Sequence, residues 1–430
     1  MDQIKKSLRF FGFCCCVCVV IIWFSPINQA NAAETKMISE ATVAPVEMEQ
    51  EAEEDETVEI EIGLNETEDL TDPNHIAEQM DWGDLDHMMQ ELQDYFAEHL
   101  SGFDLQQIWK AAKQGEIQWD LKTVLQFLGQ FLFQELTQSG GFMIQLVVLA
   151  ILAMVLHYLQ DSFNGTVATL SHGVVYLVLI SLALQVFVIA GTEAKETVHL
   201  MSDFLYALTP TLCTLLVAMG GVSSVSLFHP AMLGAVSVAI HLISAFILPA
   251  VYFSGALVVA SYITPRLAIS KMAKLVKDVA LWALGIIFTL FTAFLGILGI
   301  AGASIDGLAI KAAKSASGFF IPIIGRSIAD VLDTVISTAL VLKNVIGVLG
   351  IIVILLLIVV PAIKILVMAL LFRLAAAFVQ PLGEAQLAEA LQGLGNVVMM
   401  FFAVVAASGI FFFFLISIVI GMGNLTVALR

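Results

Sequence analysis

The chain has 430 residues, of which 59% are hydrophobic and only 13% are charged, a balance too apolar for a soluble globular protein of this length. Its formal net charge of −18 is unevenly divided: residues 33–139 carry 26 acidic and 4 basic side chains, whereas residues 140–430 carry 10 and 12. We therefore expect two parts in two environments. The acidic part excludes nucleic acid as a partner, because it would repel the phosphates.

The first 33 residues have the pattern of a secretory signal peptide. A basic segment at residues 5–9 precedes an apolar run at residues 10–24, and Ala-Asn-Ala at residues 30–32 supplies a small-x-small cleavage site. A retained signal anchor is the alternative. Four of the five cysteines lie in this segment, so after cleavage only Cys213 remains, and neither a disulfide within the chain nor a cysteine metal site is expected.

An acidic segment and a set of amphipathic helices are predicted next. Residues 34–74 are rich in Glu, Thr and Asp with few aromatics, which predicts disorder. In residues 75–139, apolar side chains recur at helical spacing, which predicts amphipathic helices outside the cytoplasm. The three apolar faces are Leu85, Met88, Met89, Leu92 and Phe96; Leu105, Ile108, Trp109 and Ala112; and Leu121, Leu125, Leu128, Leu132 and Leu136. These helices either pack together or lie on the membrane surface, although their acidic faces disfavour anionic lipid.

A polytopic membrane domain is predicted over residues 140–430, because apolar runs of membrane-spanning length follow one another there. Six runs are clear: residues 142–159, 173–190, 231–262, 279–303, 345–371 and 397–422. Two less apolar runs, residues 204–222 and 319–342, are either spans or re-entrant segments. The predicted fold class is therefore all-α, a polytopic membrane protein with six to eight transmembrane or re-entrant helices.

An internal repeat is predicted from an offset of 112 residues. This offset superimposes two pairs of prolines, Pro210 on Pro322 and Pro249 on Pro361. The repeat units would cover residues 173–284 and 285–396. Repeated membrane units with interrupted helices at matching positions are typical of transport and channel folds, in which the irregular segments line a path.

The positive charges leave two membrane topologies open. Eight crossings after an exported N-terminus place the basic cluster of residues 266–277 outside, against the positive-inside tendency. Six crossings with two re-entrant segments place that cluster in the cytoplasm. This second arrangement leaves four basic residues outside: Lys311, Lys314, Arg326 and Lys343. We favour it because the two re-entrant candidates are the least hydrophobic segments.

Ionisable and helix-breaking residues at membrane depth are the candidates for function, because such groups usually face protein or water. Lys364 follows Pro361 by three residues, where the missing proline N–H frees a carbonyl for a cation. Its alternative is to extend toward an interface with Arg373. The prolines are either gates or simple helix kinks.

A charged helix face gives the remaining candidates. Arg326, Asp330 and Asp333 stand at i, i+4 and i+7, so they share a face that either lines an aqueous path or is the wet side of an interfacial helix. The full set of candidate conduit or gating residues is Pro210, Gly220, Gly221, Pro249, Pro322, Arg326, Asp330, Asp333, Pro361, Lys364 and Arg373.

No enzyme signature is found in the sequence. The histidines form no HExxH pair, Gly220-Gly221 lacks the Lys-Ser/Thr that follows a phosphate loop, and no GxSxG occurs. We therefore expect no catalytic residues, no cofactor and no bound metal.

Short glycine and proline motifs carry a family resemblance. Leu208-Thr-Pro210-Thr, followed by Gly220-Gly221-Val-Ser-Ser224 and Phe228-His229-Pro230, resembles the signature stretch of the stage III sporulation protein AE family. Arg373-Leu-Ala-Ala-Ala377 leading to Gln380-Pro381-Leu-Gly383 supports it. The resemblance covers roughly residue 105 to the C-terminus, and the acidic segment is not part of it.

The resemblance implies a membrane protein of an endospore-forming bacterium. It would lie in the mother-cell membrane that surrounds the forespore, with its mature N-terminus in the intermembrane space. Implied partners are the other stage III A sporulation proteins (an ATPase, small membrane proteins and ring-forming proteins) and the forespore partner of the channel. The implied role is the polytopic subunit of that channel or secretion apparatus. Two alternatives stay open: an autonomous secondary transporter, and a scaffold that anchors the rings without conducting.

Overall fold

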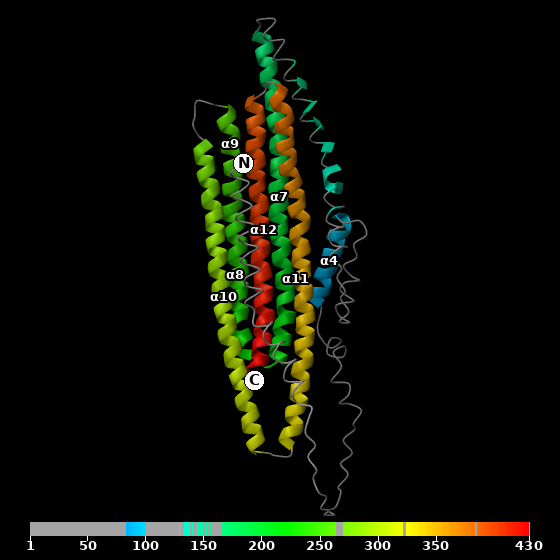
Figure 1. Ribbon diagram of the computed structural model, residues 1–430, viewed down its shortest axis with the longest axis vertical. Helices are drawn as coiled ribbons and strands as arrows, with labels where there is room; N and C mark the ends of the chain where they lie inside the picture. The colour runs from blue at the N-terminus through cyan, green and yellow to red at the C-terminus, as the bar shows by residue number, and fades with distance from the viewer. Residues whose placement is uncertain are drawn as a thin grey trace, which may run out of the picture. The chain divides into compact units, whose positions relative to one another are not determined.

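The computed structural model of the chain describes residues 83–99, 166–263, 270–320, 324–382 and 385–429, with isolated positions between 129 and 155 (Figure 1). Every regular element in these ranges is a helix. The predicted signal peptide, the acidic segment, the amphipathic face at residues 105–112 and most of the predicted span at residues 142–159 lie outside the described residues.

Nine helical elements follow one another along the described chain. They are α4 (Gly83–His99), α7 (Thr166–Ala218), α8 (Val222–Leu242), the π-helical turn η2 (Ile243–Ile247), α9 (Leu248–Ile263), α10 (Ser270–Phe320), α11 (Ile324–Val379), the 3-10 turn η3 (Gln380–Leu382) and α12 (Ala385–Ala428).

Five helical stretches among the described residues are long and apolar enough to cross a membrane. They are Leu177–Ala218, Val222–Ser261, Lys271–Ala313, Asp333–Val379 and Ala385–Ala428. The all-α membrane fold predicted from the sequence is confirmed. Each stretch has 40 to 47 residues, which makes it about 60–70 Å long at the α-helical rise. This is roughly twice the thickness of a hydrocarbon layer.

Five of the six clear apolar runs each lie mainly in one of these stretches, and the sixth, residues 142–159, lies mostly outside the described residues. The less apolar run 204–222 adds no separate span, because its residues 204–218 continue α7, a helix of 53 residues with Pro210 inside it. A proline is tolerated in a membrane helix where nearby hydroxyls satisfy the disturbed backbone. Thr209 Oγ1 donates to the Leu205 carbonyl at 2.5 Å, and Thr214 Oγ1 donates to the Pro210 carbonyl at 2.9 Å. The segment at Pro210 is thus not a separate re-entrant element.

The other helix interruptions expected from the sequence also differ from the helices that the structure shows. Residues 319–342 do not form one segment, because α10 ends at Phe320 and α11 begins at Ile324. Pro361 lies inside the continuous helix α11. At Pro249 the helix type changes: the π turn η2 ends two residues before it, with the Leu248 N–H bonded to the Ile243 carbonyl. A π turn relieves the clash of a proline ring with the preceding turn. The repeat at an offset of 112 stays a prediction, since residue 322 lies outside the described residues.

Helix α12 is the centre of the packing. It contacts α11, α10, α7 and α9, while α11 also packs on α7, and α10 on α8 and α9 (Figure 1). Glycines let these helices approach closely: a Cβ at Gly409 would overlap Ile358 of α11, and a Cβ at Gly347 would overlap Ile420 of α12. Small residues at the crossing points are the usual means of packing helices in membranes.

Helix α4 confirms the first predicted amphipathic face. Its buried side chains are Leu85, Met88, Met89, Leu92 and Phe96, the five that share one face by helical spacing. This face is buried in the same core as α7, which α4 contacts. The opposite face carries the exposed side chains of His87, Gln90 and Glu91. The helix is therefore bound to the bundle through its apolar side and keeps a polar surface outward.

Candidate functional site

An ion pair joins α7 to α11 inside the bundle. The ammonium nitrogen of Lys364 lies 3.2 Å from Oε1 and 3.1 Å from Oε2 of Glu193, and the two side chains are only 20% and 15% exposed. Lys364 follows the buried Pro361 by one helical turn, as expected from the sequence. It is compensated by a carboxylate of another helix rather than by a freed carbonyl. Sequence reasoning missed Glu193, although a carboxylate beside an apolar run is the signal that would have found it.

Aromatic contacts set the depth of this pair along the helices. The ring of Phe187 in α7 lies 5.4 Å from that of Phe401 in α12, and Phe288 of α10 stacks on Phe411 of α12 at 4.5 Å. Further along, Gly350 of α11 touches both α7 and α12, so these two helices run in the same direction. The ten residues from 401 to 411 span about 15 Å. A Cβ at Gly299 of α10 would meet Ile418 and Met422 of α12, so α10 also runs in this direction, and Phe187 therefore lies at about the depth of α10 residue 278.

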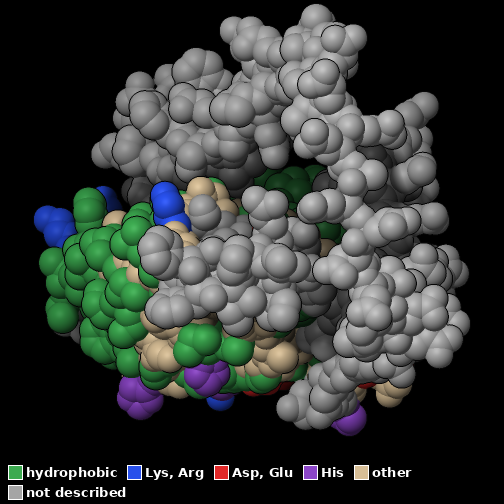
Figure 2. Space-filling model, turned by 90° about the horizontal axis from the view of Figure 1, so that it is seen from below, with side chains coloured by type: hydrophobic (Ala, Val, Ile, Leu, Met, Phe, Trp, Pro, Cys, Tyr) green, Lys and Arg blue, Asp and Glu red, His purple; other side chains and the backbone are tan. Residues whose placement is uncertain are grey.

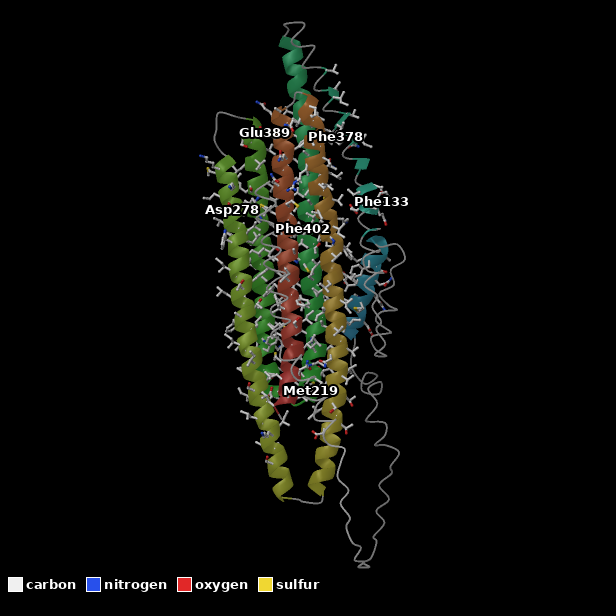
Figure 3. The ribbon with its side chains drawn as sticks, viewed as in Figure 1. Phe133, Met219, Asp278, Phe378, Glu389 and Phe402 are labelled. Atoms are coloured by element: carbon white, nitrogen blue, oxygen red, sulfur yellow. The ribbon has the colours of Figure 1, made fainter. Side chains whose placement is uncertain are left out.

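The stretch of α7 from Glu193 to Asp203 begins one to two turns beyond that level. It lies at the depth of the part of α10 that contains Ile286 and Leu290. Figure 3 shows the two ends that bound this region: Asp278 and Glu389 lie toward one end of the helices, and Met219 lies toward the other. The ion pair and its polar neighbours are thus well inside the apolar length of α10, not at its charged margin.

The outer face of α10 is apolar over this depth except at Thr289, whose hydroxyl donates to the Gly285 carbonyl at 2.7 Å. Its exposed large side chains recur at helical spacing and are Val279, Trp282, Ile286, Leu290, Phe294, Ile297 and Ile300. Trp282 is 72% exposed and Leu290 64% exposed. Charged side chains occur in α10 before this stretch, at Asp278, and after it, at Asp306. Such a face matches the hydrocarbon of a lipid bilayer.

A polar seam lies at the same depth on α7 and α8. We define it by six side chains that are exposed or half-buried: Thr192, Glu196, His199 and Asp203 of α7, and Ser237 and His241 of α8. The α7 members share one helix face by their spacing. Tyr206 Oη lies 2.9 Å from Ser237 Oγ of α8, and His199 Nε2 lies 3.4 Å from Ser244 Oγ of the π turn η2 that follows. Figure 2 shows hydrophobic side chains over one flank of the bundle, and separate histidines with small areas of acidic side chain along another edge.

The predicted Gly220-Gly221 pair forms the turn between α7 and α8. Gly220 has φ +85, a conformation that favours glycine, and its N–H and that of Gly221 bond to the carbonyls of residues 217 and 216. The first turn of α8 is capped from α10: Asp306 accepts hydrogen bonds from the backbone N–H groups of Ser223 at 2.8 Å and Ser224 at 2.7 Å. Asp306 is 2% exposed. This glycine pair therefore forms a turn whose following helix is capped by Asp306, a residue that the sequence did not single out.

A buried lysine lies at the same end of the bundle. Lys343 of α11 is fully buried and donates to the Ile420 carbonyl at 2.8 Å and to Asn424 Oδ1 at 3.3 Å, both on α12. A Cβ at Gly423 would stand 2.2 Å from the Lys343 ammonium, so glycine makes room for it. In the sequence, Lys343 appears only as one of the basic residues whose side of the membrane depends on the topology.

The remaining sequence candidates are dispersed. Pro210 is exposed on α7, and Arg373 donates to Asn396 Oδ1 at 3.1 Å at an exposed position. Asp333 is half-buried near the start of α11, 31 residues or about 46 Å from Lys364 along that helix. Pro322 and the side chains of Arg326 and Asp330 lie outside the described residues. The charged face of residues 326–333 and the ion pair are thus separate places in the fold.

Long apolar helices packed around α12, with an ion pair between two of them, define an integral membrane protein of the helical class. The family model "Stage III sporulation protein AE" matches residues 103–423. The Stage III sporulation protein AE of Bacillus subtilis (strain 168) is 35% identical over 307 residues, which cover 71% of this chain and 77% of that protein. The chain therefore belongs to the stage III sporulation protein AE family, as its glycine and proline motifs predicted. No solved structure matches it.

Proposed function

We propose that this protein is the polytopic membrane subunit of the channel or secretion apparatus that links the mother cell to the forespore and sustains late forespore development. Membership of a stage III sporulation family supports the role in sporulation. The observation that carries the role of a subunit is the two-sided exterior of the bundle. At one depth, α10 exposes Ile286 and Leu290 while α7 exposes Glu196 and Asp203.

A two-sided exterior has a direct physical consequence. Exposed carboxylates are costly against hydrocarbon and are found facing protein or water. A bundle that spanned the bilayer alone would be surrounded by lipid and would have to be apolar on every side. The polar side of this bundle is therefore suited to an assembly in which lipid covers only part of the surface.

The setting follows from the family and from the sequence. We place the protein in the mother-cell membrane around the forespore, with its mature N-terminus and residues 34–74 in the intermembrane space. Its partners would be the other stage III A proteins and the forespore partner of the channel. We assign it no catalytic step: its contribution is a path or a support for a path across the membrane.

One observation favours a second candidate, a secondary transporter. The half-buried pair of Lys364 and Glu193 at membrane depth is the kind of group that couples ion and solute movement. Purified protein in liposomes separates the two: solute flux without partners supports the transporter and contradicts the subunit. If the protein is instead a non-conducting scaffold, bulky substitutions along the polar seam should leave its function intact.

The proposal is tested by deletion and complementation in the spore-forming host. A deletion strain should complete engulfment, arrest afterwards and lose late forespore transcription, and the wild-type gene should restore spores. Normal spore yield after deletion would overturn the proposal. The matched control is a strain complemented with an exposed variant on α10, such as Leu290→Ile, which should sporulate normally because it keeps the apolar face.

A further inference from the structure

We infer that the polar seam of α7 and α8 is the water-lined face of the assembly, and that polar or charged solutes pass along it. This inference rests on the proposed function and names the surface that would carry it out. The seam carries exposed polar side chains at the depth of the exposed apolar face of α10, and the charged face of residues 326–333 is a separate place in the fold.

The first argument is depth. The seam spans residues 192–203 of α7, about 17 Å of helix, at the depth of the apolar face of α10. Among the exposed members, Glu196 and Asp203 are carboxylates and His241 is an imidazole. Lipid cannot cover such a surface at that level without a large cost. The seam therefore meets water or protein.

The second argument separates water from protein. The cores of protein interfaces are depleted of Lys, Glu, Asp and Ser and enriched in aromatic side chains. The seam has the opposite composition, with Glu196, Asp203 and Ser237 exposed and Lys195 exposed beside them. A partner that buried these groups would have to compensate every charge. Water solvates them without that requirement.

The third argument comes from α4. Helix α4 contacts α7 and carries an exposed carboxylate, Glu91, that interacts electrostatically with Asp203. Helix α4 also turns His87 and Gln90 outward. Two separate helices thus present polar surface on the same side of α7, as expected beside an aqueous space.

The test is cysteine accessibility in the full-length protein within native membranes. All five natural cysteines are replaced by serine, and single cysteines are placed at Thr192, Glu196 and Asp203 of the seam. Matched controls at the same depth are Trp282→Cys, Ile286→Cys and Leu290→Cys on α10. The probe is a charged maleimide that does not cross membranes, in membranes opened so that both sides are reached.

Because the thiolate is the reactive form and forms only where water solvates it, seam cysteines should react at least about tenfold faster than the α10 cysteines. Labelling is compared with and without the other stage III A proteins. Fast labelling of the seam in both states supports the inference. Equal, slow labelling at seam and α10 positions overturns it. Labelling that is fast in the protein alone but lost in the assembly also overturns it, because the seam is then a protein interface.

The outcome for the seam is distinguishable from that for the proposed function. A dry or protein-covered seam together with arrested sporulation in the deletion strain removes the inference and keeps the function. Normal spores from the deletion strain remove the function whatever the labelling. A variant with Glu196→Leu and Asp203→Leu, if it still reaches the membrane and binds its partners, should reduce spore yield at least about tenfold. Full spore yield from that assembled variant contradicts a water-lined path along the seam.

Discussion

The Lys364 ammonium lies within 3.2 Å of both carboxylate oxygens of Glu193 and thereby joins the last third of α11 to α7. Removing one partner leaves the other charge half-buried, so Lys364→Met should lower the free energy of unfolding by about 3 kcal/mol. The double variant with Glu193→Gln should recover most of this loss. The measurement is the temperature at which the detergent-solubilised protein loses its monodisperse peak.

The control for this pair is Lys311→Met, which removes an exposed lysine of α10. An exposed charge contributes little to stability, so its thermal midpoint should stay within the error of the wild type. Equal midpoints for Lys364→Met and Lys311→Met would show that the ion pair does not hold α11 to α7.

Asp306 should matter to stability through the first turn of α8. Asp306→Ala leaves two buried N–H groups, those of Ser223 and Ser224, without their acceptors, and should cost about 1–2 kcal/mol. Asp306→Asn keeps one acceptor oxygen, so its midpoint should fall between those of Ala and the wild type. Asp278→Ala, an exposed acidic position on the same helix, is the matched control. An order in which Asn is no better than Ala would contradict the capping role.

Features set by local periodicity could be predicted from the sequence. The face of α4 is an example: Leu85, Met88, Met89, Leu92 and Phe96 repeat at helical spacing, and burial follows from that repetition alone. The membrane class follows in the same way from long apolar runs. The family follows from short motifs whose order along the chain is distinctive.

Features set by partners far away in the sequence could not be predicted. Asp306 contacts Ser223 and Ser224 across more than 80 residues, and Lys364 contacts Glu193 across 171. In the sequence, the polar stretch from Glu193 to Asp203 resembles a connection between two spans. Its polarity alone does not reveal that it packs beside polar residues of another helix. Pro210 suggested a break for a related reason: whether a helix continues through proline depends on hydroxyls and packing around it.

Gly220 should be intolerant of a side chain for two reasons. Its φ of +85 disfavours residues with a Cβ, and a Cβ there would stand 2.9 Å from Ile310 Cδ1. Gly220→Ala should therefore cost about 1–2 kcal/mol, and Gly220→Asn less, since Asn accepts this conformation more readily. Gly234 inside α8 has open space around it, so Gly234→Ala should leave the midpoint unchanged or raise it. Thermal midpoints measure all three. A destabilised Gly234→Ala with an unaffected Gly220→Ala would reverse the expectation.

Lys343 and Gly423 should be coupled, because the space that glycine leaves on α12 is filled by the lysine side chain of α11. In Gly423→Ala the new methyl group would overlap the Lys343 ammonium, which must then abandon the Ile420 carbonyl and Asn424. We expect a loss of about 2–3 kcal/mol, since the buried charge loses its hydrogen bonds. Gly421→Ala, which meets nothing within 4 Å, should be neutral.

Lys343→Met replaces a buried ammonium by an apolar chain of similar length, and such replacements are often neutral or stabilising. The Lys343→Met/Gly423→Ala double variant should therefore be more stable than Gly423→Ala alone, because a flexible Met side chain yields to the methyl group where a bound ammonium does not. Thermal midpoints of the four variants give the coupling directly, and additive effects of Lys343→Met and Gly423→Ala would show that the two residues do not share this space.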